Sequence, residues 1–372
     1  MTVDIQGLCP PQFGEVERVF ASHFAQGREL GARFSLAIEG EIVVDLMGGF
    51  ADRAQTRRFG ADSLTIVFST TKAMAAVMLA RLVGEHRLDY GARVAEVWPE
   101  FAAAGKAKVT VGEALSHQAG LCGLLPPWSP SDWFDWDATC ERLAAMAPLW
   151  PPGSASGYHP VTFGYLAGEI FRRIEGRTLG QALREEIAGP LGLDLWIGLP
   201  DSEHARVAEV RRPPSLPDLG KPSEFKRLAF RSSPGGVDEA SFLRAEIPSV
   251  NGHATAPALA RFMALIACDG VVDGRRWLAP GAAAAVSAQR IVGQDLVLPY
   301  QISWGAGLIR NAGLGIYGPG AQSVGHSGWG GSCAFADPER RISGAYVMNR
   351  QSADLIADVR SRALIEAAYA AI

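Results

Sequence analysis

The stretch Ser69-Thr70-Thr71-Lys72, which opens a long apolar run, constrains this chain more than any other feature. The run from Ala73 to Leu82 is apolar on nearly every face, which predicts a buried helix. A serine and a lysine three residues apart lie on the same face of such a helix. Because burial penalises a charged ammonium, Lys72 is expected to be neutral or surrounded by hydroxyls. Either state suits a base that takes a proton from Ser69.

The start of this predicted helix also favours negative charge near Ser69. The first N–H groups of a helix have no intrahelical acceptor, and the helix dipole is positive at this end. The S-x-x-K pattern alone is a weak signal, since Ser69 could be only a helix cap while Lys72 extends to water. A catalytic interpretation therefore depends on the rest of the chain.

Two further motifs follow in order. Ser156-Gly157-Tyr158-His159-Pro160 precedes the helical pattern from Phe163 to Ile170, and Gly325-His326-Ser327-Gly328-Trp329 precedes strand-like segments. The order, spacing and flanks of the three motifs resemble the serine β-lactamase and penicillin-binding-protein superfamily. The resemblance is strongest to its class C-like branch and to the family VIII carboxylesterases, and it extends from about residue 31 to the C-terminal helix.

The resemblance implies a role for each motif. Ser69 would be the acylated nucleophile, Lys72 its proton acceptor, and Tyr158 a second base that passes the proton to the leaving group. The backbone N–H groups of Ser69 and Trp329 would form the oxyanion hole, which stabilises the developing charge without reorganisation. His326-Ser327-Gly328 would occupy the third motif, on an edge strand of the sheet, and would bind substrate together with Trp329.

Two positions depart from the family pattern. Pro160 stands where the resembling β-lactamases have an asparagine that contacts the substrate amide, and His326 replaces a lysine that helps to hold the substrate carboxylate. Proline offers no side-chain hydrogen bond and no backbone N–H. A neutral histidine is a weaker anion anchor than a permanent ammonium. Since Trp329 also adds bulk where a bicyclic lactam needs space, the pattern favours ester cleavage.

The leading hypothesis is a serine carboxylesterase acting on small neutral acyl esters through an acyl-Ser69 intermediate. The alternatives are a β-lactamase, a D-aminopeptidase or another amidase of the same superfamily, and a penicillin-binding protein that acylates without turnover. A noncatalytic scaffold is a further possibility, against which the set Ser69, Lys72 and Tyr158 argues. A burst followed by steady release indicates a hydrolase, whereas a burst alone indicates a trap.

Composition excludes several other classes. A net charge of −4 predicts no attraction to nucleic acid or to anionic membranes. No stretch approaches the ~18 to 20 apolar residues of a membrane span. Residues 1–9 lack a basic segment followed by an apolar one, so we expect a cytoplasmic enzyme. The expected partner is a small-molecule ester, and the oligomeric state is left open.

Cofactor chemistry has no support in the sequence. The five cysteines are scattered without a C-x-x-C pair, which predicts reduced thiols rather than a disulfide framework. The seven histidines form no H-E-x-x-H pattern, and neither a phosphate-binding G-x-x-x-x-G-K-[ST] loop nor a G-x-S-x-G elbow occurs. We therefore expect no metal and no cofactor.

The order of predicted elements favours an α/β fold of the α+β type. Residues 13–24 form an amphipathic helix, residues 34–46 a hairpin closed at 39–41, and residues 354–371 a closing helix. We expect an antiparallel sheet flanked by the N- and C-terminal helices, with an inserted, mainly helical lobe, as in β-lactamases and transpeptidases. The expected α/β lobe comprises residues 1–84 and 286–372, the helical lobe residues 85–285, and the site lies in the cleft between them.

Overall fold

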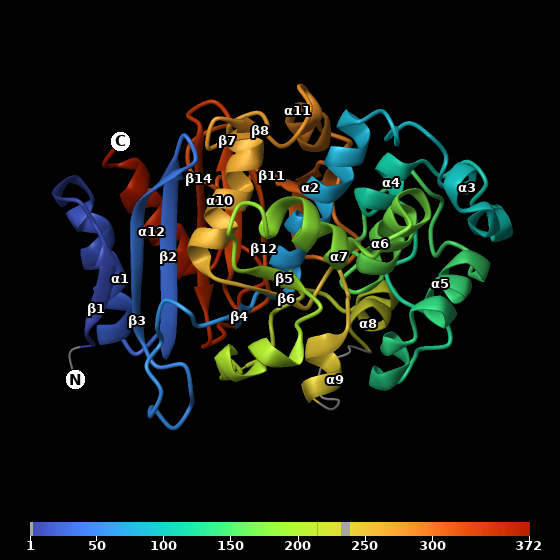
Figure 1. The fold of residues 1–372 in the computed structure, drawn as a ribbon. Helices are drawn as coiled ribbons and strands as arrows, with labels where there is room; N and C mark the ends of the chain where they lie inside the picture. Colours follow the sequence, from blue (N-terminus) through green and yellow to red (C-terminus); the bar gives the residue numbers. More distant parts are fainter. Residues whose placement is uncertain (1–2, 214, 232–238) are drawn as a thin grey trace.

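The structure, a computed structural model, describes residues 3–213, 215–231 and 239–372. A nine-stranded antiparallel sheet forms its centre, and both ends of the chain contribute strands to it (Figure 1). In spatial order the strands are β1 (Ile5–Leu8), β3 (Glu41–Gly49), β2 (Gly31–Ile38), β14 (Ile342–Met348), β13 (Cys333–Asp337), β12 (Val324–Ser327), β11 (Ile309–Arg310), β10 (Gln301–Trp304) and β9 (Ile291–Gln294). The predicted fold class is thus confirmed.

The hairpin of β2 and β3 is closed where the sequence predicted it. Glu39 and Gly40 both have positive φ values, 54° and 89°, which allow the tight reversal. All residues of β2 except Ile38 are buried. A strand buried along its whole length requires cover on both faces of the sheet.

Helices provide this cover. The N-terminal α1 (Gly14–Ala25) packs beside the C-terminal α12 (Val359–Tyr369), at the end of the molecule that carries both termini (Figure 1). Helix α10 (Ala256–Ala267) packs against β14, β13 and β2. The predicted N-terminal helix is therefore confirmed, and the closing helix is shorter than predicted.

The helix that follows Ser69 is α2 (Thr71–Gly84), and every residue from Thr71 to Ala80 is buried. It contacts α6 (Thr162–Glu175), α7 (Leu179–Leu183), α11 (Ala282–Ser287) and β12. This contact on all sides is what the uniformly apolar sequence predicted.

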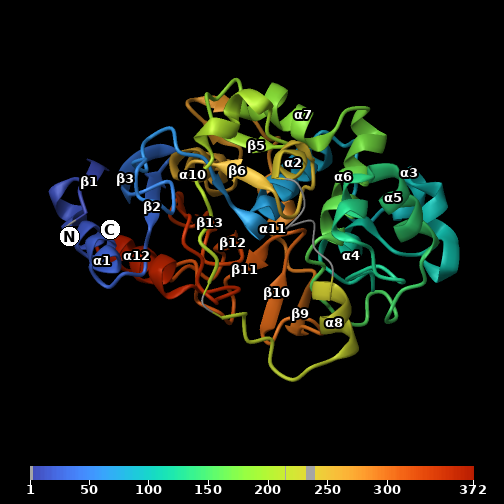
Figure 2. The same ribbon diagram turned by 90° about the horizontal axis from the view of Figure 1, so that it is seen from below.

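The remaining elements lie mainly on the side away from the termini (Figure 2). They are α3 (Val94–Val97), α4 (Val111–Leu115), α5 (Trp136–Ala145), α8 (Glu224–Arg231) and α9 (Glu239–Arg244), a small sheet of β4 (Thr65–Ile66), β6 (Gly252–Ala254) and β5 (Leu195–Ile197), and a hairpin of β7 (Val271–Val272) and β8 (Arg275–Arg276). Among the described residues, no helix combines the length and the apolar character needed to cross a bilayer.

Two features of the structure differ from the predicted arrangement: the place of α10 and the place of the strand that carries His326. Helix α10 falls within residues 85–285, the range predicted for the helical lobe, yet it packs on the sheet and groups with the α/β part. The lobe boundaries themselves remain a prediction. The predicted position of His326 on an edge strand is wrong. Strand β12 lies between β13 and β11 because β9, β10 and β11 extend the sheet beyond it. However, β11 pairs only with Val324 and Gly325, so among the described residues no strand pairs with His326 and Ser327 on the β11 side.

Candidate active site

Ser69 lies in a tight helical turn, Phe68–Thr70, that connects β4 to α2. Phe68, directly before it, has a φ of 45°, which is uncommon for a residue other than glycine and is often found at functional sites. The hydroxyl of Ser332 ties this turn to the β12–β13 connection. It donates to the Val67 carbonyl at 2.8 Å and lies 3.1 Å from the Thr70 hydroxyl.

Lys72 is completely buried, and its Nζ has three oxygen neighbours. The distances are 3.2 Å to Ser69 Oγ, 2.8 Å to the Pro160 carbonyl and 3.0 Å to the Ser249 carbonyl. Burial without a neighbouring carboxylate among these partners lowers the pKa of Lys72 well below its ordinary value. A neutral amine has two N–H donors and one lone pair. In that neutral form the two carbonyls, which can only accept, take both N–H groups and leave the lone pair of Lys72 for the Ser69 hydroxyl, whereas a protonated Nζ donates to all three oxygens.

Tyr158 lies directly beside this pair. Lys72 Nζ is 4.7 Å from the centre of the Tyr158 ring, which stacks on Trp304 with a centroid separation of 5.9 Å. Burial raises the pKa of Tyr158, and a hydrogen bond with Ser69 partly opposes this shift. The phenol is therefore protonated at neutral pH and able to donate a proton.

The loop that carries Tyr158 is held by two side chains, those of Asp295 and His159, to which the sequence assigned no role. The carboxylate of Asp295 accepts 2.9 Å hydrogen bonds from the backbone N–H groups of Tyr158, Val297 and Leu298. His159 Nε2 accepts a hydrogen bond from the Leu121 N–H at 3.0 Å. Asp295 lies outside the three motifs, and His159 lies in the second motif without a role assigned to it, because each acts through backbone contacts that form only on folding.

His117 holds the same loop. Its Nδ1 accepts a hydrogen bond from the His159 N–H at 3.1 Å, and its ring packs edge-on against Tyr158 and Trp304. The pKa of His117 is lowered well below its ordinary value by burial, and then by His159 and Lys72. The His117 ring that packs against Tyr158 and Trp304 is thus uncharged at neutral pH.

The third motif presents a neutral histidine. His326 is 1% exposed, and its Nδ1 lies 2.8 Å from the Ser327 carbonyl, which can only accept and so places the proton on Nδ1. Burial, with a smaller effect from Lys72, lowers the pKa of His326 to about 3. The hydroxyl of Ser327 lies 3.1 Å from that of Tyr317. His326 therefore carries no charge that could hold a substrate carboxylate.

The turn after the third motif packs tightly against the Ser69 turn. A Cβ atom on Gly328 would lie 2.2 Å from the Val67 carbonyl oxygen, so only glycine fits at this position. The N–H of Gly328 donates to the Ser332 carbonyl at 2.7 Å, and that of Gly330 donates to the Asp354 carbonyl at 3.2 Å. No described residue accepts a hydrogen bond from the Trp329 N–H between them.

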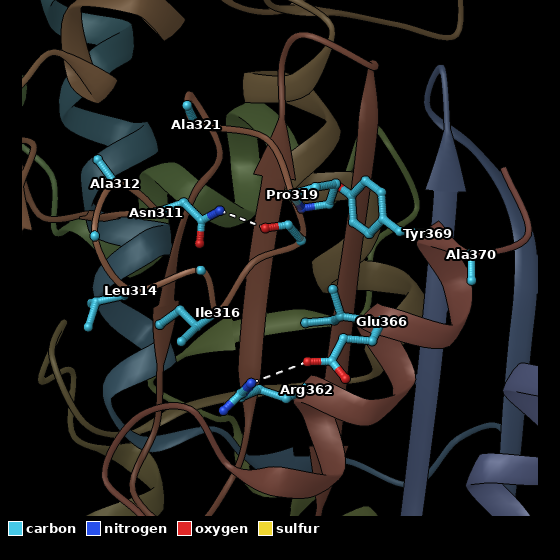
Figure 3. A pocket seen from close by; sticks show the side chains of 14 residues that line it. Asn311, Ala312, Leu314, Ile316, Pro319, Ala321, Arg362, Glu366, Tyr369 and Ala370 are labelled. Carbon is cyan, nitrogen blue, oxygen red and sulfur yellow. Dashed lines mark hydrogen bonds and ion pairs between the residues drawn. The ribbon is translucent and has the colours of Figure 1, made fainter.

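A separate hollow of about 820 Å³ lies between residues 311–321 and α12 (Figure 3). Its lining includes Asn311, Arg362 and Tyr369 and none of the residues of the three motifs. Within the described part of the chain, no cluster of histidine, cysteine and acidic side chains could hold a metal ion.

Comparisons with known proteins identify similar sequences and similar structures. Residues 16–369 match the model of the Beta-lactamase family. "Esterase/beta-lactamase LipL" of Mycobacterium tuberculosis is 38% identical over 94% of this chain and 84% of its own length. A crystal structure described as a novel penicillin-binding protein homolog from Caulobacter crescentus is 63% identical, with a TM-score of 0.97 over 99% of this chain and 100% of that one. A family VIII carboxylesterase is 41% identical, with a TM-score of 0.94 over 99% of this chain and 100% of that one. The chain belongs to the beta-lactamase family and is a serine hydrolase of that family.

Proposed function

We propose that this protein is a carboxylesterase that hydrolyses small neutral acyl esters through an acyl-Ser69 intermediate. The observation that carries the proposal is the environment of Lys72. Its Nζ has two backbone carbonyls and the Ser69 hydroxyl, 3.2 Å away, as neighbours, so that the neutral amine gives its N–H groups to the carbonyls and its lone pair to Ser69. A buried, neutral lysine in this arrangement is an activating base for a serine nucleophile.

The proposed reaction begins when Ser69 Oγ attacks the ester carbonyl and its proton passes to Lys72. The negative charge that develops on the carbonyl oxygen is held by the N–H groups of Ser69 and Trp329. Tyr158 donates its proton to the departing alkoxide and regains one from Lys72, which restores both neutral groups. Water then attacks the acyl-enzyme while the same groups transfer protons in the reverse direction, which releases the acid and regenerates Ser69.

The preference for neutral esters follows from the two departures at Pro160 and His326. The Pro160 carbonyl is engaged by Lys72, and its ring supplies no donor or acceptor for a substrate amide. His326 is neutral at pH 7, since its pKa is lowered to about 3. Substrates that bring a carboxylate therefore find no cation at the third motif. The names of two relatives, an esterase/beta-lactamase and a family VIII carboxylesterase, support ester hydrolysis.

Lactam hydrolysis, or acylation without turnover, is the second candidate. It is favoured by the shared acylation groups and by relatives described as penicillin-binding proteins. The test compares nitrophenyl esters of increasing acyl length with a chromogenic cephalosporin, and the Ser69→Ala variant serves as the control. We expect steady ester turnover that exceeds cephalosporin turnover by several orders of magnitude in kcat/KM.

Ser69→Ala should abolish both turnover and covalent labelling by a phosphonate while the fold remains intact. Covalent labelling that persists on the folded variant would identify a different nucleophile. Comparable kcat/KM values for the two substrate classes would contradict the ester preference. A burst of ester cleavage without subsequent release would instead identify an acylating trap.

A further inference from the structure

The C-terminal helix α12 contributes a buried arginine that reaches the turn after the third motif. Arg360 is 2% exposed, and its Nη2 donates to the Gly330 carbonyl at 2.7 Å. Gly330 directly follows Trp329, whose N–H is the proposed oxyanion donor. The Arg360 guanidinium thus connects α12 to Gly330, the residue that follows the proposed oxyanion donor.

Arg360 is itself held in one orientation. Asp358 accepts from its Nε at 3.0 Å and from its Nη2 at 2.8 Å, and Glu29 accepts from its Nη1 at 3.0 Å. The carbonyls of Arg28 and Arg350 also accept from Nη1, at 3.1 and 2.9 Å. A planar guanidinium engaged on all its edges has a defined position, which a flexible ammonium would lack.

The turn is adapted to this guanidinium. Gly331 has a φ of 127°, and a Cβ atom there would lie 2.5 Å from both Arg360 Nη2 and Asp358 Oδ2. The carbonyl of Trp329 accepts from Gln351 Nε2 at 3.2 Å. The peptide between Trp329 and Gly330 is therefore held at both ends, because the Gly330 N–H also donates to a backbone carbonyl at 3.2 Å.

We propose that Arg360, fixed by Asp358 and Glu29, is a positioning residue that aims the Trp329 N–H at the oxyanion. This inference rests on the proposed function, in which Trp329 supplies that donor. An oxyanion donor is effective only within about 2.7 to 3.1 Å of the charge it stabilises, so a small displacement of the turn weakens it. Burying one guanidinium between two carboxylates has a large desolvation cost, so the arrangement is not explained by stability alone. Holding the turn after Trp329 in one geometry gives it a role in addition to stability.

The test is Arg360→Lys, which keeps the positive charge but loses the fork that reaches Gly330. A trifluoromethyl ketone with the acyl group of the best ester forms a hemiketal oxyanion on a nucleophilic serine, and its affinity reports the oxyanion hole directly. We expect kcat and the affinity for this ketone to fall by the same factor, roughly ten- to a hundredfold, as part of the ~10²- to 10³-fold that one donor supplies. KM and the affinity for the noncovalent product acid should remain unchanged.

The matched control is Arg362→Lys on the same helix, where the arginine is exposed and pairs with Glu366 (Figure 3). It should leave every one of these constants unchanged. Unaltered ketone affinity in folded Arg360→Lys would overturn the proposal. An equal loss of ketone and product-acid affinity would also overturn it, because general distortion affects both ligands.

Asp358→Asn provides a second variant if Arg360→Lys does not fold. It keeps the guanidinium and weakens the fork that orients it, so a smaller loss of ketone affinity is expected, and no loss would overturn the proposal. Failure of the wild-type enzyme to bind the ketone would refute the Ser69 mechanism and the positioning role together. Normal wild-type binding with unaltered variants would refute the positioning role alone.

Discussion

Acidification should destabilise this protein through histidines that stay neutral in the folded state. Burial lowers the pKa of His159 and of His326 to about 3 and that of His253 to about 4, whereas the ordinary value is 6.5. At these three histidines the unfolded chain therefore binds more protons below pH 6.5 than the folded chain does. Their contribution to the free energy of unfolding must then fall as the pH is lowered from 6.5 through the folded-state values.

The magnitude for one such histidine follows from the difference between these pKa values. At pH 5, which is 1.5 units below the unfolded-state value, each fully buried histidine destabilises the fold by about 2 kcal/mol relative to pH 7. Glu29 acts in the opposite direction, because burial raises its pKa to about 7 in spite of the neighbouring Arg360. The pH dependence of the whole protein is thus a sum of opposing contributions, and a single substitution is needed to isolate one histidine.

His253→Asn isolates such a contribution, because His253 lies on β6 and is outside the proposed catalytic groups. We expect the loss of unfolding free energy between pH 7 and pH 5 to be about 2 kcal/mol smaller in His253→Asn than in the wild type. Urea unfolding at both pH values measures this difference. The exposed His86, replaced in the same way, serves as the control for the substitution itself. An identical pH dependence in His253→Asn and the wild type would refute the reasoning from burial.

Three predictions concern catalysis. Lys72→Ala and Tyr158→Phe should each lower kcat by ~10²- to 10⁴-fold. The double variant should lose little more, because the two groups act as one proton relay. Near-normal turnover of Tyr158→Phe would assign Tyr158 to packing alone. In the wild type, kcat/KM should rise with pH as Lys72 loses its proton at its lowered pKa. It should then stay level up to pH 10, since the pKa of Tyr158 is raised. A decline of kcat/KM near neutral pH would contradict these protonation states. Pro160→Asn combined with His326→Lys should raise cephalosporin hydrolysis relative to ester hydrolysis. Each restored contact contributes ~1.5 to 3 kcal/mol, or roughly ten- to a hundredfold in kcat/KM. An unchanged ratio of the two kcat/KM values would show that other features exclude lactams.

The sequence alone determined the elements whose signal is local. The uniform apolar run after Ser69 predicted that α2 is buried on all sides, and the spacing of Ser69 and Lys72 predicted that their side chains meet. The alternation around Gly40 likewise predicted the hairpin of β2 and β3. In each case the periodicity of neighbouring residues decides which face is buried, independently of where the rest of the chain lies.

Only the tertiary structure decided how the site is assembled and charged. The carbonyl of Ser249, 177 positions after Lys72, takes one of its two N–H groups, and no side-chain pattern marks a backbone carbonyl in advance. Strand β12 proved to be internal because strand order depends on long-range pairing. Asp295 and Arg360 hold backbone groups that approach them only in the folded chain. The lowered pKa values of Lys72 and His326 have the same origin, since a pKa is shifted by the burial that packing produces.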